Sequence, residues 1–158
     1  MEIKIKQLSI GDFVNYKKPS LLIGLPYCSF KCEKESGIAC CQNSELATSP
    51  IIYTTTNRLV EIFDNSDICE AVVFGGLEPF DSWTELLDFI KIFRVNHNSD
   101  IVIYTGYNKE EIIDKITILQ NYNNIIIKYG RFIPNQKSKY DDILGITLAS
   151  PNQYAEVL

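Results

Sequence analysis

Residues 21–32 have the sequence LLIGLPYCSFKC, in which a short apolar run leads directly into a loop with two cysteines. The run from Leu21 to Leu25 is closed by Pro26 and predicts a buried strand. Comparable apolar runs follow at 68–74, 101–104 and 125–127. Continuous apolar runs of this kind are typical of strands that are covered on both faces of a sheet.

Amphipathic helices are predicted between these strands. Ser82 and Glu85 form the Ser-x-x-Glu pattern of a capping box. Asn108 can cap a further helix, and Glu110 and Glu111 fall in its first turn, where carboxylates interact favourably with the helix dipole. The apolar faces of the expected helices consist of Leu59, Val60 and Phe63; Trp83, Leu86, Leu87, Ile90 and Phe93; and Ile112, Ile113, Ile116 and Leu119.

Strands that alternate with helices predict an α/β fold with a mostly parallel sheet. In such a fold the loops that follow the strands gather at the carboxyl edge of the sheet, where ligands bind. Three unusual segments are expected at this edge: the cysteine loop after the first core strand, Gly75–Pro79 (GGLEP) and Thr105–Tyr107 (TGY). The sequence therefore predicts that the chemistry of the protein takes place there.

The composition is that of a globular protein with one core. The chain has 158 residues and a mass of 18.0 kDa, with 46% hydrophobic and 22% charged residues, which suits a single domain over residues 1–158. A net charge of −5 argues against a nucleic-acid partner, which needs a basic face. No apolar run approaches the ~20 residues of a membrane helix, and the N-terminus lacks the apolar stretch of a signal peptide. We therefore expect a cytoplasmic protein with no membrane partner.

Four of the five cysteines lie within fourteen positions, at Cys28, Cys32, Cys40 and Cys41, whereas Cys69 stands alone. Thiolates at such short spacing select zinc or an iron–sulfur cluster. A structural zinc site would need four ligands, but adjacent cysteines rarely both bind one tetrahedral ion because their side chains diverge. Three cysteines would instead leave one iron of a 4Fe–4S cluster open to an outside ligand.

These motifs, in this order, resemble the radical S-adenosylmethionine (SAM) superfamily. Cys28-x3-Cys32 together with Cys41–Asn43 is similar to the superfamily's cysteine signature, and Gly75–Pro79 is similar to its GGEP segment. The sequence departs from the superfamily pattern in two places. Eight residues separate the second and third cysteines of the signature where the superfamily has two, and Leu77 is inserted into the glycine segment.

Three later segments are similar to the activating proteins of anaerobic ribonucleotide reductases: Tyr104–Tyr107, Tyr129–Phe132 and Ser150–Gln153. Tyr129 stands where these activators commonly have an aspartate before the glycine. The resemblance as a whole extends from about Leu21 to Gln153. It implies an incomplete (βα) barrel with the cluster loop after the first core strand.

The resemblance also implies a set of site residues. Cys28, Cys32 and Cys41 would hold three irons of a 4Fe–4S cluster, and Cys40 is the alternative third ligand. The fourth iron would bind the methionyl end of SAM. The residues implied around this cosubstrate are Cys40, Gln42, Asn43, Gly75, Gly76, Glu78, Thr105 and Tyr107. No catalytic residue is implied beyond the cluster.

The implied activity is that of a radical SAM oxidoreductase that activates a glycyl-radical enzyme. It would cleave SAM to a 5′-deoxyadenosyl radical, which removes a hydrogen from a glycine of a large partner. The first partner expected is anaerobic ribonucleoside-triphosphate reductase, and the expected electron donor is a flavodoxin or a ferredoxin-type protein. Two alternatives from other classes stay open: a 4Fe–4S electron-transfer or cluster-carrier protein, and a structural zinc-binding adaptor. The GGLEP loop argues against a carrier, because a ferredoxin-type protein needs no ligand edge.

Overall fold

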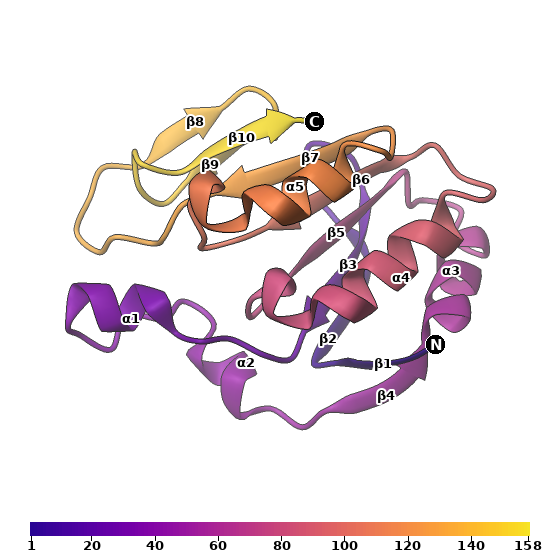
Figure 1. The fold of residues 1–158 in the computed structure, drawn as a ribbon, viewed down its shortest axis with the longest axis horizontal. Coiled ribbons are helices and arrows are strands. Elements are labelled where there is room, and N and C mark those ends of the chain that lie inside the picture. The colour runs from indigo at the N-terminus through magenta and orange to yellow at the C-terminus, as the bar shows by residue number, and fades with distance from the viewer.

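The computed structural model describes residues 1–158 and is built around a six-stranded sheet (Figure 1). Across the sheet the strands follow the order β10-β7-β6-β5-β3-β2. Their bounds are Gln7–Asp12 for β2, Ser20–Leu25 for β3, Ala71–Gly76 for β5, Asp100–Tyr104 for β6, Ile125–Tyr129 for β7 and Tyr154–Val157 for β10. The strands predicted from the apolar runs are present as β3, β5, β6 and β7, and these run parallel to one another.

The predicted fold class, an incomplete (βα) barrel with a mostly parallel sheet, is wrong. The sheet is open and mixed, because the edge strands β2 and β10 run antiparallel to their neighbours. Two more antiparallel pairs stand outside this sheet, β1 (Glu2–Ile5) with β4 (Ile52–Thr55) and β8 (Lys139–Asp141) with β9 (Ile146–Leu148). Of the seven strand pairings, four are therefore antiparallel and three are parallel.

The antiparallel direction of the edge strands has physical causes that cannot be recognised from apolar runs. β2 has no buried residue, so its sequence lacks the apolar run of a central strand. Its connection to β3 spans only residues 13–19, which is too short for the crossover that a parallel pair requires. β10 returns beside β7 after the β8–β9 hairpin and closes the other edge.

Three helices cover one face of the sheet: α3 (Thr56–Asp64), α4 (Trp83–Phe93) and α5 (Ile113–Leu119) (Figure 1). Their apolar side chains form the main core together with the strand residues of that face. At its centre the rings of Phe74 and Phe89 meet edge to face, with centroids 5.0 Å apart, and Phe93 stacks on Phe89 at 5.4 Å. None of the helices has both the length and the apolar character needed to cross a membrane.

The capping box predicted at Ser82 and Glu85 is not formed, although α4 begins at the next residue, Trp83. A 3₁₀ turn, η1 (Pro79–Ser82), directly precedes α4, so Ser82 lies inside a helical segment and not in front of one. The Ser82 hydroxyl is buried without a hydrogen-bond partner. Glu78 caps η1 instead, because its carboxylate accepts a 3.1 Å hydrogen bond from the Phe80 amide. A second 3₁₀ turn, η2 (Lys109–Ile112), precedes α5 in the same way.

The opposite face of the sheet is only partly covered. Tyr16 and the hairpin-region residues Leu144 and Leu148 pack against it and form a second, smaller core. Beyond this cover, towards the carboxyl ends of the strands, Leu22 and Val73 line a cavity. This incomplete cover leaves space above the strand ends for a ligand.

Four of the five cysteines lie on an extended segment, the cysteine arm (residues 27–50), which contains the short helices α1 (Lys31–Ser36) and α2 (Ser44–Thr48). No residue from Tyr27 to Pro50 is buried. Figure 1 shows α1 at the end of a long loop, away from the sheet. The arm therefore contributes nothing to the two cores, and polar contacts hold it in place.

Candidate functional site

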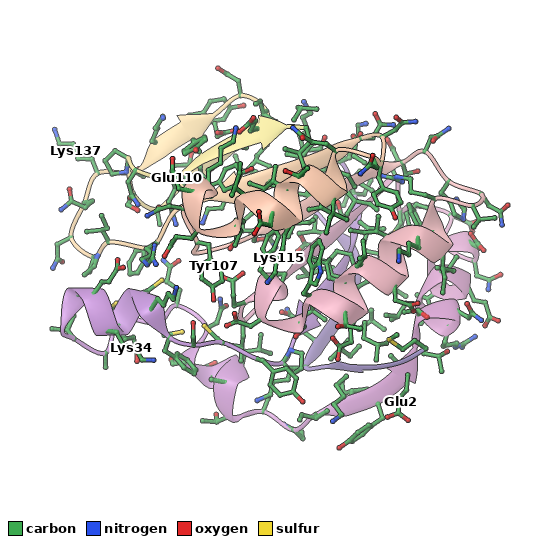
Figure 2. All side chains as sticks on the ribbon, viewed as in Figure 1. Glu2, Lys34, Tyr107, Glu110, Lys115 and Lys137 are labelled. Carbon is green, nitrogen blue, oxygen red and sulfur yellow. The ribbon has the colours of Figure 1, made fainter.

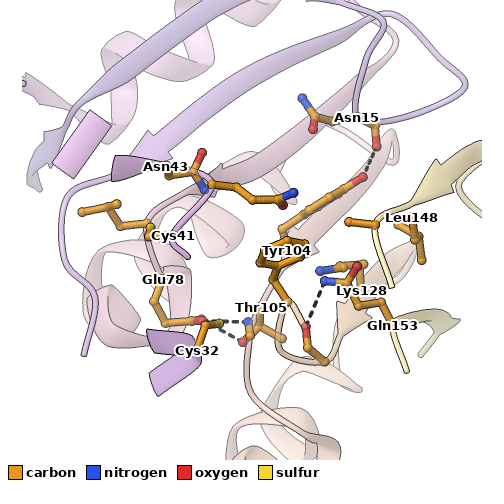
Figure 3. A pocket seen from close by; sticks show the side chains of 18 of the residues that line it. Asn15, Cys32, Cys41, Asn43, Glu78, Tyr104, Thr105, Lys128, Leu148 and Gln153 are labelled. Atoms are coloured by element: carbon orange, nitrogen blue, oxygen red, sulfur yellow. Dashed lines mark hydrogen bonds between the residues drawn. The ribbon is translucent and has the colours of Figure 1, made fainter. Parts of the chain in front are cut away.

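A cavity of about 540 Å³ lies at the carboxyl ends of the parallel strands, between the cysteine arm and the β8–β9 hairpin (Figure 3). The cavity is lined by residues from all three segments that are predicted to gather at this edge. The predicted site residues found in its wall are Cys28, Cys32, Cys41, Gln42, Asn43, Gly75, Gly76, Glu78 and Thr105. Cys40 and Tyr107 are not among the lining residues.

The thiols of the arm are free, and three of them face this cavity. Burial raises the pKa of Cys28 to about 11 and also raises the pKa of Cys32, so both thiols keep their protons in the absence of a metal. Cys40 is directed elsewhere, with its sulfur 3.2 Å from the Ser36 hydroxyl and 3.8 Å from the Cys32 carbonyl oxygen. Of the two adjacent cysteines, Cys41 is therefore the one that lines the cavity.

The chemistry of this donor set fits an iron–sulfur cluster. No three Cys, His, Asp or Glu side chains of the chain converge closely enough to hold a single metal ion. The ligands of a 4Fe–4S cluster bind separate irons, so they surround a larger object than the ligands of one zinc ion do. This larger spacing is present here, because Cys28, Cys32 and Cys41 are distributed over the wall of one cavity.

The glycine segment after β5 brings backbone close to β3. Gly76 has a φ of +81°, and a Cβ atom added there would lie 2.6 Å from the Cα of Gly24. A side chain at position 76 would be strained by this φ and would collide with β3. The glycine at position 76 is therefore required by the local packing, whereas a Cβ at Gly75 would meet only Leu22, at 3.8 Å. Both glycines line the cavity.

Glu78 joins this loop to the loop that follows β6 (Figure 3). The residue is 6% exposed, and its Oε1 accepts a 2.8 Å hydrogen bond from the Thr105 hydroxyl while Oε2 accepts one of 2.9 Å from the Gly106 amide. Burial raises the pKa of Glu78 to about 7, and these hydrogen bonds oppose the rise. Glu78 therefore organises the loops at the edge of the cavity.

Tyr107 belongs to the contact between the sheet and the cysteine arm, where Figure 2 shows it. Its hydroxyl donates a 2.6 Å hydrogen bond to Asp81 Oδ1, and Asp81 Oδ2 accepts one of 2.9 Å from the Ser29 amide. The Lys31 ammonium lies 4.4 Å from the centroid of the Tyr107 ring. Tyr107 thus helps to fix the arm.

A group of charged residues continues this contact, and we call Lys31, Glu35, Glu111 and Arg131 the arm latch. Arg131 donates two hydrogen bonds of 2.7 Å to the Glu111 carboxylate. Lys31 and Glu35 of the arm approach this pair, with Lys31 Nζ 3.4 Å from Glu111 and Glu35 Oε1 2.9 Å from Arg131 Nε. The hydrogen bonds from Arg131 lower the pKa of Glu111 to about 2, so Glu111 is ionised at neutral pH.

Sequence reasoning missed Lys128 as a cavity residue, together with its neighbour Tyr104. Lys128 is only 8% exposed, and its ammonium lies 5.5 Å from the centroid of the Tyr104 ring. Burial lowers the pKa of Lys128 to about 8, which leaves it mostly protonated at neutral pH. The signal was present in the sequence, because Lys128 is the single charge in the apolar strand IIIKY.

Residues 21–153 match the model of a protein family described as a 4Fe-4S single cluster domain. The matched residues begin in β3, include the whole cysteine arm and the cavity strands, and end with Gln153 of the cavity wall. No curated protein and no solved structure shows significant similarity to the chain. Since the match covers most of the 158 residues, the chain belongs to the 4Fe-4S single cluster domain family.

Proposed function

We propose that this protein is a radical SAM activating enzyme, in which Cys28, Cys32 and Cys41 hold a 4Fe–4S cluster and SAM binds in the adjoining cavity. The observation that supports this proposal is a single cavity whose wall contains the three thiols, the glycine loop and Thr105. A protein that only held a cluster would not require such a cavity beside it. The family match is to a cluster domain, so SAM and its chemistry belong to the proposal.

The number of cysteines at the cavity determines what the site can do. Cys40 has its sulfur against Ser36 and the Cys32 carbonyl, which leaves three thiols for four irons. The remaining iron could then accept the amino and carboxylate groups of SAM. The chemistry that a bound cluster supplies is one electron to the sulfonium of SAM, which breaks a C–S bond and leaves methionine and a 5′-deoxyadenosyl radical.

The chain's own residues position the cosubstrate. Gly75 and Gly76 have no Cβ, so their backbone can come close to the methionyl amino group. Both oxygens of Glu78 already accept hydrogen bonds from this segment and from the loop after β6. We therefore propose that the role of Glu78 is to hold these loops in place. Thr105 lies on the next loop, where it can flank the nucleoside.

The target that we propose is a backbone glycine of a large partner enzyme, with anaerobic ribonucleotide reductase as the first candidate. The partly covered face of the sheet and the arm with no buried residues suit a site that admits a loop from another protein. A flavodoxin or ferredoxin-type protein would supply the electron.

A second candidate is a 4Fe–4S electron-transfer or cluster-carrier protein. The description of the matching family names a single cluster and no cosubstrate, so the match alone favours this simpler function. The cavity next to the thiols is the observation that sets the two candidates apart. A zinc adaptor has less support, since no set of four thiols surrounds one point.

Anaerobic reconstitution with iron and sulfide, followed by EPR of the reduced protein with and without SAM, tests the proposal. We expect a 4Fe–4S signal that changes when SAM is added. Cys41→Ala should abolish it, whereas the matched control Cys40→Ala should keep it. A cluster signal that SAM does not alter would favour the carrier, and tightly bound zinc without a cluster would exclude both iron–sulfur functions.

A further inference from the structure

Lys128 is a buried cation without a partner. It lies in β7, is 8% exposed and lines the cavity, yet its ammonium takes part in no hydrogen bond or ion pair within the chain. Buried charges in proteins are normally paired, because an isolated charge that has lost its hydration is costly. This unpaired cation therefore faces the cavity whose wall also contains the three thiols.

No neighbour of Lys128 forms a hydrogen bond or an ion pair with its ammonium, although the charges of Cys32 and Glu78 are near enough to favour its protonated form. The Tyr104 hydroxyl already donates a 2.6 Å hydrogen bond to the carbonyl oxygen of Asn15, so Tyr104 offers Lys128 only the face of its ring. Glu78 uses its oxygens for the Phe80 and Gly106 amides and the Thr105 hydroxyl. Figure 3 shows Lys128 beside Leu148 and Gln153, on the other side of the cavity from Cys41.

We propose that Lys128 is the anion anchor of this cavity, and that its ammonium binds the carboxylate of a small molecule seated there. Lys128 is the only cationic residue in the cavity wall. A single positive charge matches a monovalent carboxylate better than a phosphate, which proteins commonly hold with several donors or an arginine fork. The face of the Tyr104 ring keeps the ammonium in place without consuming its hydrogen-bonding capacity.

Two molecules could bring this carboxylate: SAM, through its methionyl end, or a separate small substrate. Only the first source depends on the proposed function. The charge, the burial and the missing partner of Lys128 apply equally to both, so the anion anchor can be tested independently of radical chemistry.

The first test measures affinity by calorimetry on the reconstituted protein under anaerobic conditions. SAM and decarboxylated SAM are titrated into the wild type, Lys128→Met, Lys128→Arg and the control Lys91→Met, which changes an exposed lysine of α4. If the carboxylate belongs to SAM, Lys128→Met should weaken SAM binding about tenfold, or ~1.4 kcal/mol. Lys128→Arg should restore most of this loss, and decarboxylated SAM should bind the wild type and Lys128→Met equally.

The second test requires no variant. Lys128 of the wild type is modified by reductive methylation, read by mass spectrometry, with Lys91 as the internal reference. Protection by SAM but not by decarboxylated SAM supports the methionyl carboxylate. Protection by millimolar acetate but not by SAM supports a separate substrate. In that case the EPR experiment remains the test of whether SAM binds next to the cluster. If none of these molecules protects Lys128 and Lys128→Met binds SAM as tightly as the wild type, the anion anchor is wrong.

Discussion

Replacing Arg131 with Met should loosen the cysteine arm and destabilise the whole protein. Arg131 makes two 2.7 Å hydrogen bonds to Glu111, whose side chain is 32% exposed. Breaking a fully buried ion pair costs ~3–5 kcal/mol, and breaking an exposed one costs ~0–1 kcal/mol. The half-buried latch lies between these limits, so we expect Arg131→Met to lower the free energy of unfolding by about 2 kcal/mol, or ~4–8 °C in Tm.

The change should also expose the thiols, since Glu35 of the arm loses its partner Arg131. Glu111, which faces Lys31 of the arm, also loses the two hydrogen bonds that hold its carboxylate in place. The rate at which Cys32 reacts with a thiol reagent should therefore rise in Arg131→Met. The matched control is Arg58→Met, which removes the exposed pair with Glu61, at 61% and 59% exposure, and should cost less than ~0.5 kcal/mol. Equal Tm values for the two variants, with unchanged Cys32 reactivity, would refute the role of the latch.

Three further predictions concern the loops and the core. Gly76→Ala should lower the free energy of unfolding by at least ~3 kcal/mol, because the φ of Gly76 is +81° and the new Cβ would lie 2.6 Å from the Cα of Gly24. Gly37→Ala is the control, at φ +72° with open space around it, and should lower it by only ~1 kcal/mol. Urea titration of both variants measures the difference. Burial raises the pKa of Glu78 from 4.5 to about 7, so the folded state binds this proton more tightly than the unfolded state does. The contribution of Glu78 to stability therefore falls as the pH rises through this range. The unfolding free energy of the wild type relative to Glu78→Gln should then drop by ~2–3 kcal/mol between about pH 5 and pH 8, and a flat difference would contradict the shift. Phe89→Ala should lose ~3–5 kcal/mol with an unchanged m-value, because Phe89 is fully buried in the main core; a loss below ~1 kcal/mol would mean that this packing is misassigned.

The central strands and the main helices could be predicted because their burial dictates their composition. The strand predicted from Leu21 to Leu25 is β3, which is buried along its whole length, and the apolar face that ends at Phe93 is the buried face of α4. Strands buried on both faces need continuous apolar residues, and helices that pack on one side need apolar residues at helical spacing.

The edges of the sheet could not be predicted from the same signal. β2 has no buried residue, and the C-terminal strand β10 has a single one, Ala155. Their pairing is decided by backbone hydrogen bonds and by the lengths of the connections, neither of which leaves an apolar pattern. For this reason the apolar pattern predicts a mostly parallel sheet, whereas the sheet is mixed.

At the site, the sequence could indicate which segments come together but not how each side chain points. The order of the strands brings Cys28, Gly75 and Thr105 to one cavity, as the predicted carboxyl edge requires. The choice between Cys40 and Cys41 and the removal of Tyr107 from the cavity depend on local contacts of the arm. These contacts involve residues far apart in the sequence, such as Tyr107 and Asp81, which no local pattern connects.

The absence of buried residues in the cysteine arm has a consequence for how the finished protein is assembled. Both hydrophobic cores are complete without any atom of residues 27–50, so the scaffold can fold before iron is delivered. Amide protons of the arm should then exchange with solvent through local opening, long before those of β5 and β6 do. An iron–sulfur donor would therefore meet a folded scaffold whose thiols are accessible on the arm. Insertion of the cluster would then be the last step in which the protein becomes ordered.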